Sequence, residues 1–182
     1  MKSARSAWVT RWILAASGLL VVSAIVAQRP QPAKTAGEEL IPASRRVIAP
    51  DFTLTDVYGK EITLSKYRGR VVLLDFWATT CGGCKIELPW YVDFNSKYRN
   101  QGLSLIGLDM YGESADVIKP FMVKWHMSYP VAIGTDALGE RFGLREMPLT
   151  LLIDRNGRIA VSHAGIVDRA TFESDVQRLL EE

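Results

Sequence analysis

The sequence predicts an α/β domain in which a mixed β-sheet lies between helices. Short apolar runs of strand length alternate with longer segments of helical spacing, and the last two apolar runs are joined by a tight turn. A chain of 182 residues is long enough to bury one substantial core. Its composition, 48% hydrophobic and 23% charged, is that of an ordinary globular protein.

The first 27 residues are predicted to form a signal or anchor segment. They carry basic residues and no acidic ones, and Trp12–Ala27 is an uncharged apolar run. We favour an uncleaved anchor, although Ala24 and Ala27 would suit a signal peptidase. The positive-inside rule then places the rest of the chain outside the cytoplasm. Residues 28–48, rich in proline, alanine and charge, are predicted as a flexible tether, and residues 49–182 as the folded domain.

The charge balance argues against nucleic acid as a partner. Three of the 22 Lys and Arg residues lie in residues 1–27, which leaves 19 basic against 20 acidic residues in the remainder. Such a near-neutral surface has no basic footprint for a phosphate backbone. The chain has only two cysteines, too few for a disulfide-scaffolded fold.

The folded domain is predicted to open with a β-hairpin over 52–64, because two alternating runs flank the turn Tyr58-Gly59-Lys60. Residues 71–77 are apolar except for Asp75 and are predicted as a central strand. The elements expected next are a helix over 82–100 containing Pro89, a strand over 103–108, a helix from Ser114 to about His126, a strand over 131–133 and a helix over 136–142.

The chain is predicted to close with a hairpin and a helix. Residues 149–154 and 158–162 flank the turn signal Asn156-Gly157. The last helix is expected to begin at Asp168 or Thr171, because apolar residues then recur on one face up to Leu180.

A Cys-x-x-Cys motif, Cys81-Gly82-Gly83-Cys84, stands between the predicted central strand and the helix that follows. This arrangement is typical of a dithiol/disulfide redox site. Free backbone N–H groups at the helix start should favour the thiolate of Cys81, which is the form that attacks a disulfide. Cys84 lies one turn further in, so we expect it to be less exposed and to act as the resolving thiol.

A metal site is the alternative for the same cysteines. The two cysteines could be half of a zinc site, which would need two more ligands. The only histidines in the sequence, His126 and His163, are both far away in it. We expect these two histidines to be surface or core residues rather than catalysts.

Two acids are placed to take a proton from Cys84. Asp75 is the only charge in its strand, and burial would raise its pKa. Glu87 shares a helical stripe with Cys84, Tyr91, Phe94 and Tyr98, which puts it on the buried side. Either acid is a candidate proton acceptor. The alternatives are a structural, hydrogen-bonded Asp75 and a solvated Glu87 in the first turn.

Four motifs together resemble the TlpA/ResA/DsbE group of membrane-tethered, thioredoxin-like bacterial proteins. They are Ala49-Pro50-Asp51-Phe52-Thr53-Leu54, the run 69–79, Cys81-x-x-Cys84-Lys85-x-Glu87-x-Pro89, and Met147-Pro148-x-Thr150-x-Leu152-Ile153-Asp154-x-x-Gly157. The resemblance implies a thioredoxin fold with an N-terminal β-hairpin and a central αβ insertion at Ser114–Ile133. It also implies a cis peptide at Met147-Pro148 beside Cys81, which binds the backbone of a partner and keeps metals off the sulfurs.

The predicted site follows from the motifs and the resemblance together. The candidate catalytic residues are Cys81, Cys84, Glu87, Asp75 and Pro148. The candidate substrate-binding residues are Trp77, Thr80, Gly82, Gly83, Met147 and Pro148. Two positions depart from the group: Thr80 stands where a Trp usually precedes the first cysteine, and Gly83 replaces a common Pro. Partner choice and redox potential are therefore not inherited from it.

These observations predict a cell-envelope thiol–disulfide oxidoreductase without a cofactor. We favour a monomeric reductant of protein disulfides that is anchored in the inner membrane and re-reduced by a membrane electron donor. Cytochrome c maturation is one client process that the resemblance suggests. The alternatives are a disulfide oxidant or isomerase, and a copper-binding protein that uses Cys81 and Cys84. Peroxide reduction is disfavoured because the Pro-x-x-x-Thr-x-x-Cys approach to a peroxidatic cysteine is missing.

Overall fold

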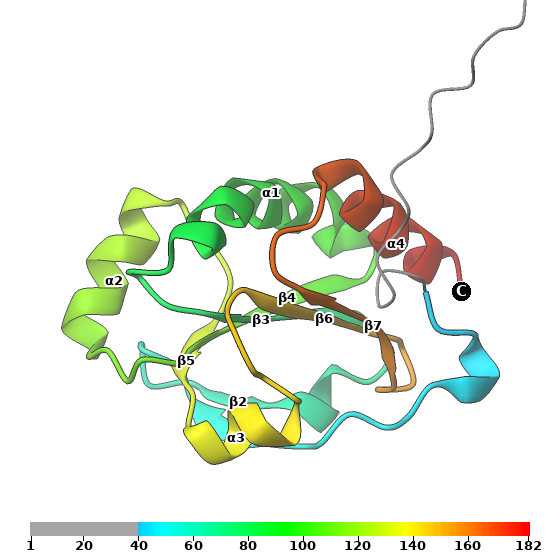
Figure 1. Ribbon diagram of the computed structural model, residues 1–182, viewed down its shortest axis with the longest axis horizontal. Helices are drawn as coiled ribbons and strands as arrows, with labels where there is room; N and C mark the ends of the chain where they lie inside the picture. The colour runs from blue at the N-terminus through cyan, green and yellow to red at the C-terminus, as the bar shows by residue number, and fades with distance from the viewer. Residues whose placement is uncertain (1–39) are drawn as a thin grey trace, which may run out of the picture. The chain divides into compact units, whose positions relative to one another are not determined.

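A five-stranded mixed sheet is the framework of residues 40–182, the part of the chain that this computed structural model describes (Figure 1). The strand order is β5-β4-β3-β6-β7. The strands are β3 (Val71–Trp77), β4 (Leu103–Asp109), β5 (Val131–Ile133), β6 (Leu149–Ile153) and β7 (Ile159–Ala164). β3, β4 and β5 run parallel, whereas β6 is antiparallel to both β3 and β7. The sheet is therefore mixed, as the alternation of elements predicts.

Helices cover both faces of this sheet. Helices α1 (Gly82–Tyr98) and α4 (Arg169–Glu181) lie side by side on one face (Figure 1). The other face carries α3 (Asp136–Arg141) and the hairpin of β1 (Thr53–Thr55) and β2 (Glu61–Thr63). Helix α2 (Ala115–Lys124) and β5 follow β4 and extend one edge of the sheet, which is the predicted central insertion. The predicted fold class, including the N-terminal hairpin, is confirmed.

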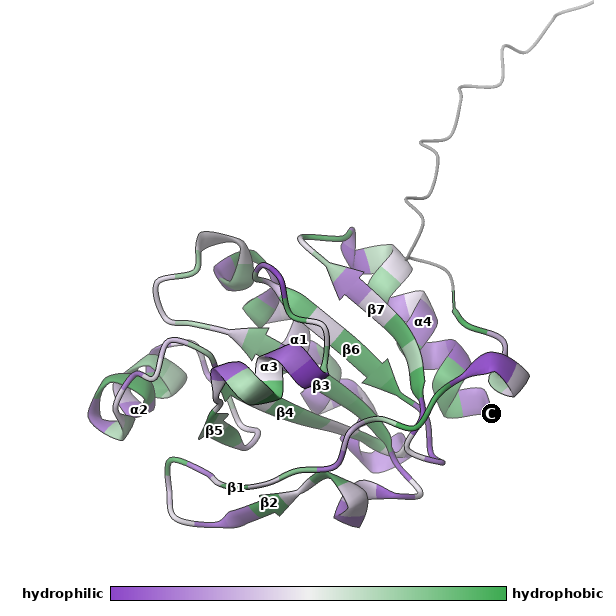
Figure 2. Ribbon diagram, turned by 60° about the horizontal axis from the view of Figure 1, so that its bottom comes forward, coloured by the Kyte–Doolittle hydropathy of each residue, from purple (hydrophilic) through white to green (hydrophobic). Residues whose placement is uncertain are grey.

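Strand β3 is buried along its whole length, because both of its faces contact apolar side chains. Leu73 and Trp77 pack on the side of α1, and Leu74 and Phe76 pack on the side of the hairpin. Successive side chains of a strand point to opposite faces, so Asp75 lies on the α1 side. Figure 2 shows the central strands predominantly in the hydrophobic colour. A carboxyl group in this strand is thus shielded from solvent.

The packed chain begins earlier than the predicted boundary at Ala49. Leu40 is buried in the core on the α1 side, and the Ile41 N–H donates to the Ala160 carbonyl of β7. The guanidinium of Arg46 is buried between the carboxylates of Asp154 and Glu182. Composition indicated a tether here, because these long-range partners leave no local signature. Residues 1–27 and the first part of the predicted tether lie outside the described residues.

Two helix ends differ slightly from the predictions. Helix α1 ends at Tyr98 rather than Asn100, and a 3₁₀ turn follows over Arg99–Gln101. Helix α2 ends at Lys124 rather than near His126. At the last helix the Asp168 side chain accepts from the N–H groups of Ala170 and Thr171, so the cap is Asp168. Within residues 40–182, no helix is both long and apolar enough to cross a lipid bilayer.

Candidate active site

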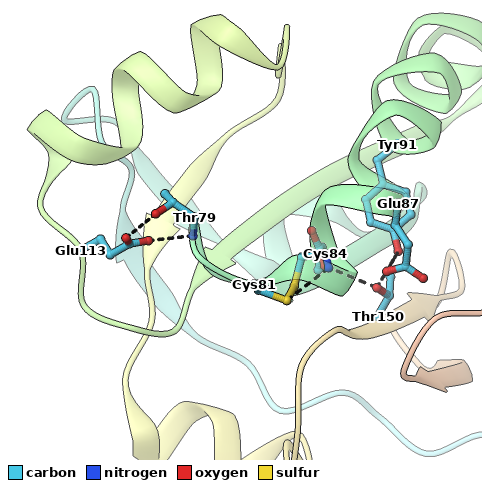
Figure 3. The surroundings of a disulfide bond; sticks show 8 residues. Thr79, Cys81, Cys84, Glu87, Tyr91, Glu113 and Thr150 are labelled. Atoms are coloured by element: carbon cyan, nitrogen blue, oxygen red, sulfur yellow. Dashed lines mark hydrogen bonds between the residues drawn. A yellow bond between two sulfur atoms is a disulfide. The ribbon is translucent and has the colours of Figure 1, made fainter.

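The two cysteines form a disulfide at the start of α1 (Figure 3). The sulfurs are 2.07 Å apart, and Cys81 is the N-cap residue of the helix. The Cys84 backbone N–H donates to Cys81 Sγ over 3.2 Å. Cys81 is partly exposed, whereas Cys84 is only 2% exposed. An attacking partner can therefore reach the outer sulfur but not the inner one, and the outer sulfur receives a backbone hydrogen bond that suits a thiolate.

A hollow of about 710 Å³ opens in front of Cys81. Its wall includes Thr80, Gly82, Gly83 and Met147, four of the predicted substrate-binding residues. The remaining wall comes from the end of β4, from α3 and from the segment that follows α3. Those residues are Met110, Tyr111, Asp136, Gly139, Glu140, Leu144, Arg145 and Glu146. The sequence does not single these residues out, because they belong to no motif and only the fold brings them to Cys81.

The loop before β6 closes on the spacer between the cysteines. The Met147-Pro148 peptide bond is cis, as the resemblance implies. A Cβ atom on Gly83 would stand 3.0 Å from Pro148 Cδ and 3.4 Å from the Ile166 side chain. Gly83 therefore allows the Pro148 ring and Ile166 to approach the Cys-x-x-Cys backbone more closely than any other residue would.

The structure does not support Trp77 as a substrate-binding residue. Its side chain is fully buried and stacks on Phe121, with ring centroids 5.2 Å apart. The position at the end of an apolar strand is consistent with this burial, because both faces of β3 are covered. Trp77 is thus a core residue at the end of β3, directly before the loop that leads to Cys81.

Both predicted acids are buried under α1. Glu87 is 1% exposed and Asp75 is 2% exposed, so the alternative of a solvated Glu87 is wrong. Burial raises the pKa of Glu87 to about 7, against smaller lowering effects of the Tyr91 hydroxyl and the Val167 backbone N–H. Burial, with the charge of Glu87 as a second cause, raises the pKa of Asp75 well above its usual range. Both carboxyl groups are therefore poised to hold a proton.

A second pair of acids, absent from the predictions, holds the loop before Cys81. The Thr79 N–H donates to Glu113 Oε2 over 2.8 Å, and the Thr79 hydroxyl donates to Glu113 Oε1 (Figure 3). The Glu113 N–H in turn donates to Asp109 Oδ2 over 2.8 Å. Asp109 is fully buried at the end of β4, and burial raises its pKa to about 6. The only sequence signal was a pair of acids just beyond an apolar strand, which is too common to single out.

His163 is a core residue on β7. Its Nε2 lies 3.3 Å from Asp175 Oδ2, and its ring lies 4.8 Å from that of Phe172. Among residues 40–182, no group of three or more His, Cys, Asp and Glu side chains is arranged to hold a metal ion. The copper alternative therefore gains no additional ligand set from the described part of the chain.

The model of the AhpC/TSA family matches residues 46–162, which span the Cys-x-x-Cys motif, both acids and the cis-proline loop. The chain belongs to the AhpC/TSA family. A thiol-disulfide oxidoreductase ResA of Bacillus cereus is 32% identical over 133 residues, 72% of this chain and 76% of the relative. The ResA of Bacillus subtilis (strain 168) is 34% identical over 125 residues, 68% of each chain.

Relatives of this chain with solved structures have the same fold. A protein from Chlorobium tepidum assigned as thiol:disulfide interchange protein DsbE aligns with a TM-score of 0.69 and 31% identity, covering 74% of this chain and 96% of its own. A thioredoxin family protein from Chlorobium tepidum TLS aligns with a TM-score of 0.67 and 26% identity, covering 75% and 97%. The family, these relatives and the Cys81–Cys84 pair identify the AhpC/TSA-family chain as a thiol-disulfide oxidoreductase with a thioredoxin-like fold.

Replacing Gly83 with alanine should lower the free energy of unfolding of the oxidised protein by about 1–2 kcal/mol, because the new methyl group overpacks against Pro148 and Ile166. Gly82→Ala is the matched control, since nothing lies within 4 Å of a Cβ there. The control should be neutral or more stable by about 0.5 kcal/mol. Denaturant unfolding measures both variants, and equal stabilities would contradict the close approach at Gly83.

Burial of Glu87 should make the oxidised protein less stable as the pH rises. The ordinary pKa of 4.5 applies to the unfolded chain and a pKa of about 7 to the folded one, so the folded state binds more protons between these values. The free energy of unfolding should therefore fall from about pH 4.5 to pH 7, by on the order of 3 kcal/mol for this residue.

The Glu87→Gln variant measures that contribution. Relative to the parent protein, it should gain stability from about pH 4.5 to pH 7 in denaturant titrations and level off above that, while buried Asp75 leaves a residual slope in both. Glu140→Gln, on the exposed surface of α3, is the control and should track the parent protein. Parallel pH curves for Glu87→Gln and its parent would contradict a buried, proton-holding Glu87.

Proposed function

We propose that this oxidoreductase reduces disulfide bonds of protein substrates outside the cytoplasm. The observation that carries the proposal is the asymmetry of the two sulfurs. Cys81 opens to the hollow at a helix N-terminus, and Cys84 is buried behind it. A dithiol built in this way accepts a partner sulfur at one cysteine only and keeps the other for the second step.

In the first step, the Cys81 thiolate attacks one sulfur of the substrate disulfide. A mixed disulfide forms between Cys81 and the substrate, and the second substrate sulfur leaves as a thiolate. The N–H of Cys84 and the helix start stabilise the attacking thiolate of Cys81. We assign the walls formed by Thr80, Gly82, Gly83 and Met147, together with Pro148, which packs against Gly83, to binding of the substrate segment around its cysteine.

In the second step, Cys84 loses its proton and attacks Cys81 Sγ. The Cys81–Cys84 disulfide forms, the remaining substrate sulfur leaves as a thiolate, and the substrate has gained two electrons. Glu87 lies three residues after Cys84 on the buried face of α1, and Asp75 lies beneath the same face. We assign the removal of the Cys84 proton to these two carboxyl groups. The pKa of Glu87, raised to about 7, matches a base that works near neutral pH, and burial raises the pKa of Asp75 as well.

The reducing direction is supported by the resemblance of the chain to the TlpA/ResA/DsbE group. Turnover then needs a dithiol donor, and a membrane protein that reduces the Cys81–Cys84 disulfide is the proposed partner. Oxidation or isomerisation is the second candidate. A protein from Bacteroides thetaiotaomicron assigned as a protein disulfide isomerase aligns with 34% identity and a TM-score of 0.64. The reduction potential of the Cys81–Cys84 couple decides between them, since a strongly reducing value fits only the first.

The proposed location is the cell envelope, with residues 1–27 as an inner-membrane anchor or signal and residues 28–39 within the tether. The basic, then apolar, composition of the N-terminus supports it. Apocytochromes c awaiting haem attachment are a proposed client, supported by the group resemblance alone. We propose that the protein acts as a monomer.

The Cys84→Ser variant should accumulate mixed disulfides with substrate proteins through Cys81, because the resolving thiol is lost and the attacking one remains. Non-reducing gels and mass spectrometry of the trapped species, with insulin as a model substrate, provide the measurement. Cys81→Ser is the control and should trap far less, since Cys84 is buried. Equal trapping by both variants, or by neither, would overturn the exchange mechanism.

A further inference from the structure

A continuous chain of hydrogen-bonding groups joins Asp75 to Glu87 beneath α1. Glu87 Oε2 lies 3.1 Å from the Tyr91 hydroxyl, which lies 2.8 Å from Thr150 Oγ1 (Figure 3). Thr150 Oγ1 lies 3.4 Å from Asp75 Oδ1, the longest of the three links. All four side chains are at most 2% exposed. Two acids on different elements are thus connected only through the two hydroxyl groups.

The number of hydrogen atoms available to this series of hydrogen bonds indicates the protonation state of the two acids. Three links need three hydrogens, and the hydroxyls of Tyr91 and Thr150 supply one each. The third hydrogen must come from a carboxylic acid at one end. With neither acid protonated, one link has no hydrogen and two like charges face a buried pair of hydroxyls. With both acids protonated on the oxygens that join the network, four hydrogens compete for three links, and one of them has no acceptor there.

We propose that Tyr91 and Thr150 are positioning residues that couple Asp75 to Glu87, so that the two carboxyl groups share one proton and act as a single base. The use of this base in resolving the mixed disulfide rests on the proposed function. The sharing of the proton does not, because it is a property of the oxidised protein as well.

The four side chains from Asp75 to Glu87 have two arrangements with equal numbers of hydrogen bonds. In one, Asp75 is protonated and donates to Thr150, Thr150 donates to Tyr91, and Tyr91 donates to ionised Glu87. In the other, every donor is reversed and Asp75 is ionised. The first arrangement leaves Glu87 as an anion whose second oxygen, Oε1, bonds to no side chain of residues 40–182. That oxygen then takes the proton of the Cys84 thiol and later returns it to the departing substrate thiolate, so the proton count balances.

Two other titratable groups, on different elements, lie close to this hydrogen-bonded chain. The charge of His163 on β7 lowers the pKa of Glu87, and His163 itself contacts Asp175 of α4. Tyr129, in the segment before β5, is close enough to Asp75 for that charge to contribute to its raised pKa, after burial. Neither the His163 ring nor the Tyr129 hydroxyl hydrogen-bonds to any group of residues 40–182. The charge of His163 therefore shifts the titration of Glu87, and neither His163 nor Tyr129 carries the coupling between the two acids.

Carboxyl ¹³C resonances of the oxidised, full-length protein test the coupling directly, because the sulfurs do not titrate in the disulfide form. In the parent protein, the Asp75 and Glu87 signals should both move in each of the same two pH steps, as coupled sites do. In Tyr91→Phe, each signal should move mainly in a step of its own. Tyr98→Phe is the matched control on the same helix, since its hydroxyl bonds to Glu173 instead.

Thr150 provides a second, independent pair of variants. Thr150→Val removes the hydroxyl at nearly constant shape and should uncouple the two carboxyl signals, whereas Thr150→Ser keeps the hydroxyl and should preserve the shared steps. This pair remains decisive if Tyr91→Phe does not fold. Independent titration of Asp75 and Glu87 in the parent protein, or unchanged shared steps in both Tyr91→Phe and Thr150→Val, would overturn the proposal.

The kinetic consequence is measured on the reduced protein. Resolution of a preformed mixed disulfide at Cys81 should slow by about tenfold in Tyr91→Phe, with an altered pH–rate profile, while attack by Cys81 stays unchanged. Tyr98→Phe should match the parent protein. A parent protein that exchanges with no disulfide would refute the proposed function and leave the carboxyl titration standing. An unaltered resolution profile in Tyr91→Phe would refute the shared base in catalysis.

Discussion

The burial of β3 on both faces is the constraint on which the site depends. An element covered on both sides has a fixed depth in the fold, and this strand ends at Trp77, directly before the loop that leads to α1. Cys81 is the N-cap of that helix and receives the Cys84 N–H. The same burial removes water from Asp75, whose pKa rises because the charged form loses its hydration. The same buried strand therefore leads to the outer sulfur of the disulfide and carries the buried acid beneath it.

The loop between β3 and α1 is held from the side of β4. Glu113 accepts two hydrogen bonds from Thr79 and is itself held by Asp109. These bonds fix the residues directly before Cys81, whereas Pro148 and Ile166 pack against Gly83 directly after it. The outer sulfur thus lies between a hydrogen-bonded segment at Thr79 and an apolar contact at Gly83. Its position is determined by elements that are close to it only because β4, β3 and β6 are neighbours in the sheet.

A site residue can be predicted from the sequence when the residues it contacts are close to it in the sequence, and not when only the fold brings them together. Cys81, Cys84 and Glu87 share one helix, so their spacing alone predicted which of them is exposed and which are buried. Thr150 was visible only as part of a motif, because its contact with Asp75 depends on the β3–β6 register, which pairs those two residues. Trp77 was misassigned because an amphipathic ring fits a surface or a core equally well. The start of the packed chain at Leu40 leaves no local sequence signal, because the partners of Arg46 lie near the other end of the chain.

The departures from the group at Thr80 and Gly83 have a common physical effect. Thr80 provides no aromatic side chain next to Cys81, and the hollow there is lined instead by residues distant in the sequence, among them Tyr111, Leu144 and Met147. Gly83 lacks the ring that would keep the spacer away from the cis-proline loop, so Pro148 packs directly on the backbone between the two cysteines. Bulk that the motif lacks is thus supplied by residues distant in sequence. If the hollow binds the substrate as proposed, we expect substrate preference to depend on those distant elements as well as on the Cys-x-x-Cys spacer.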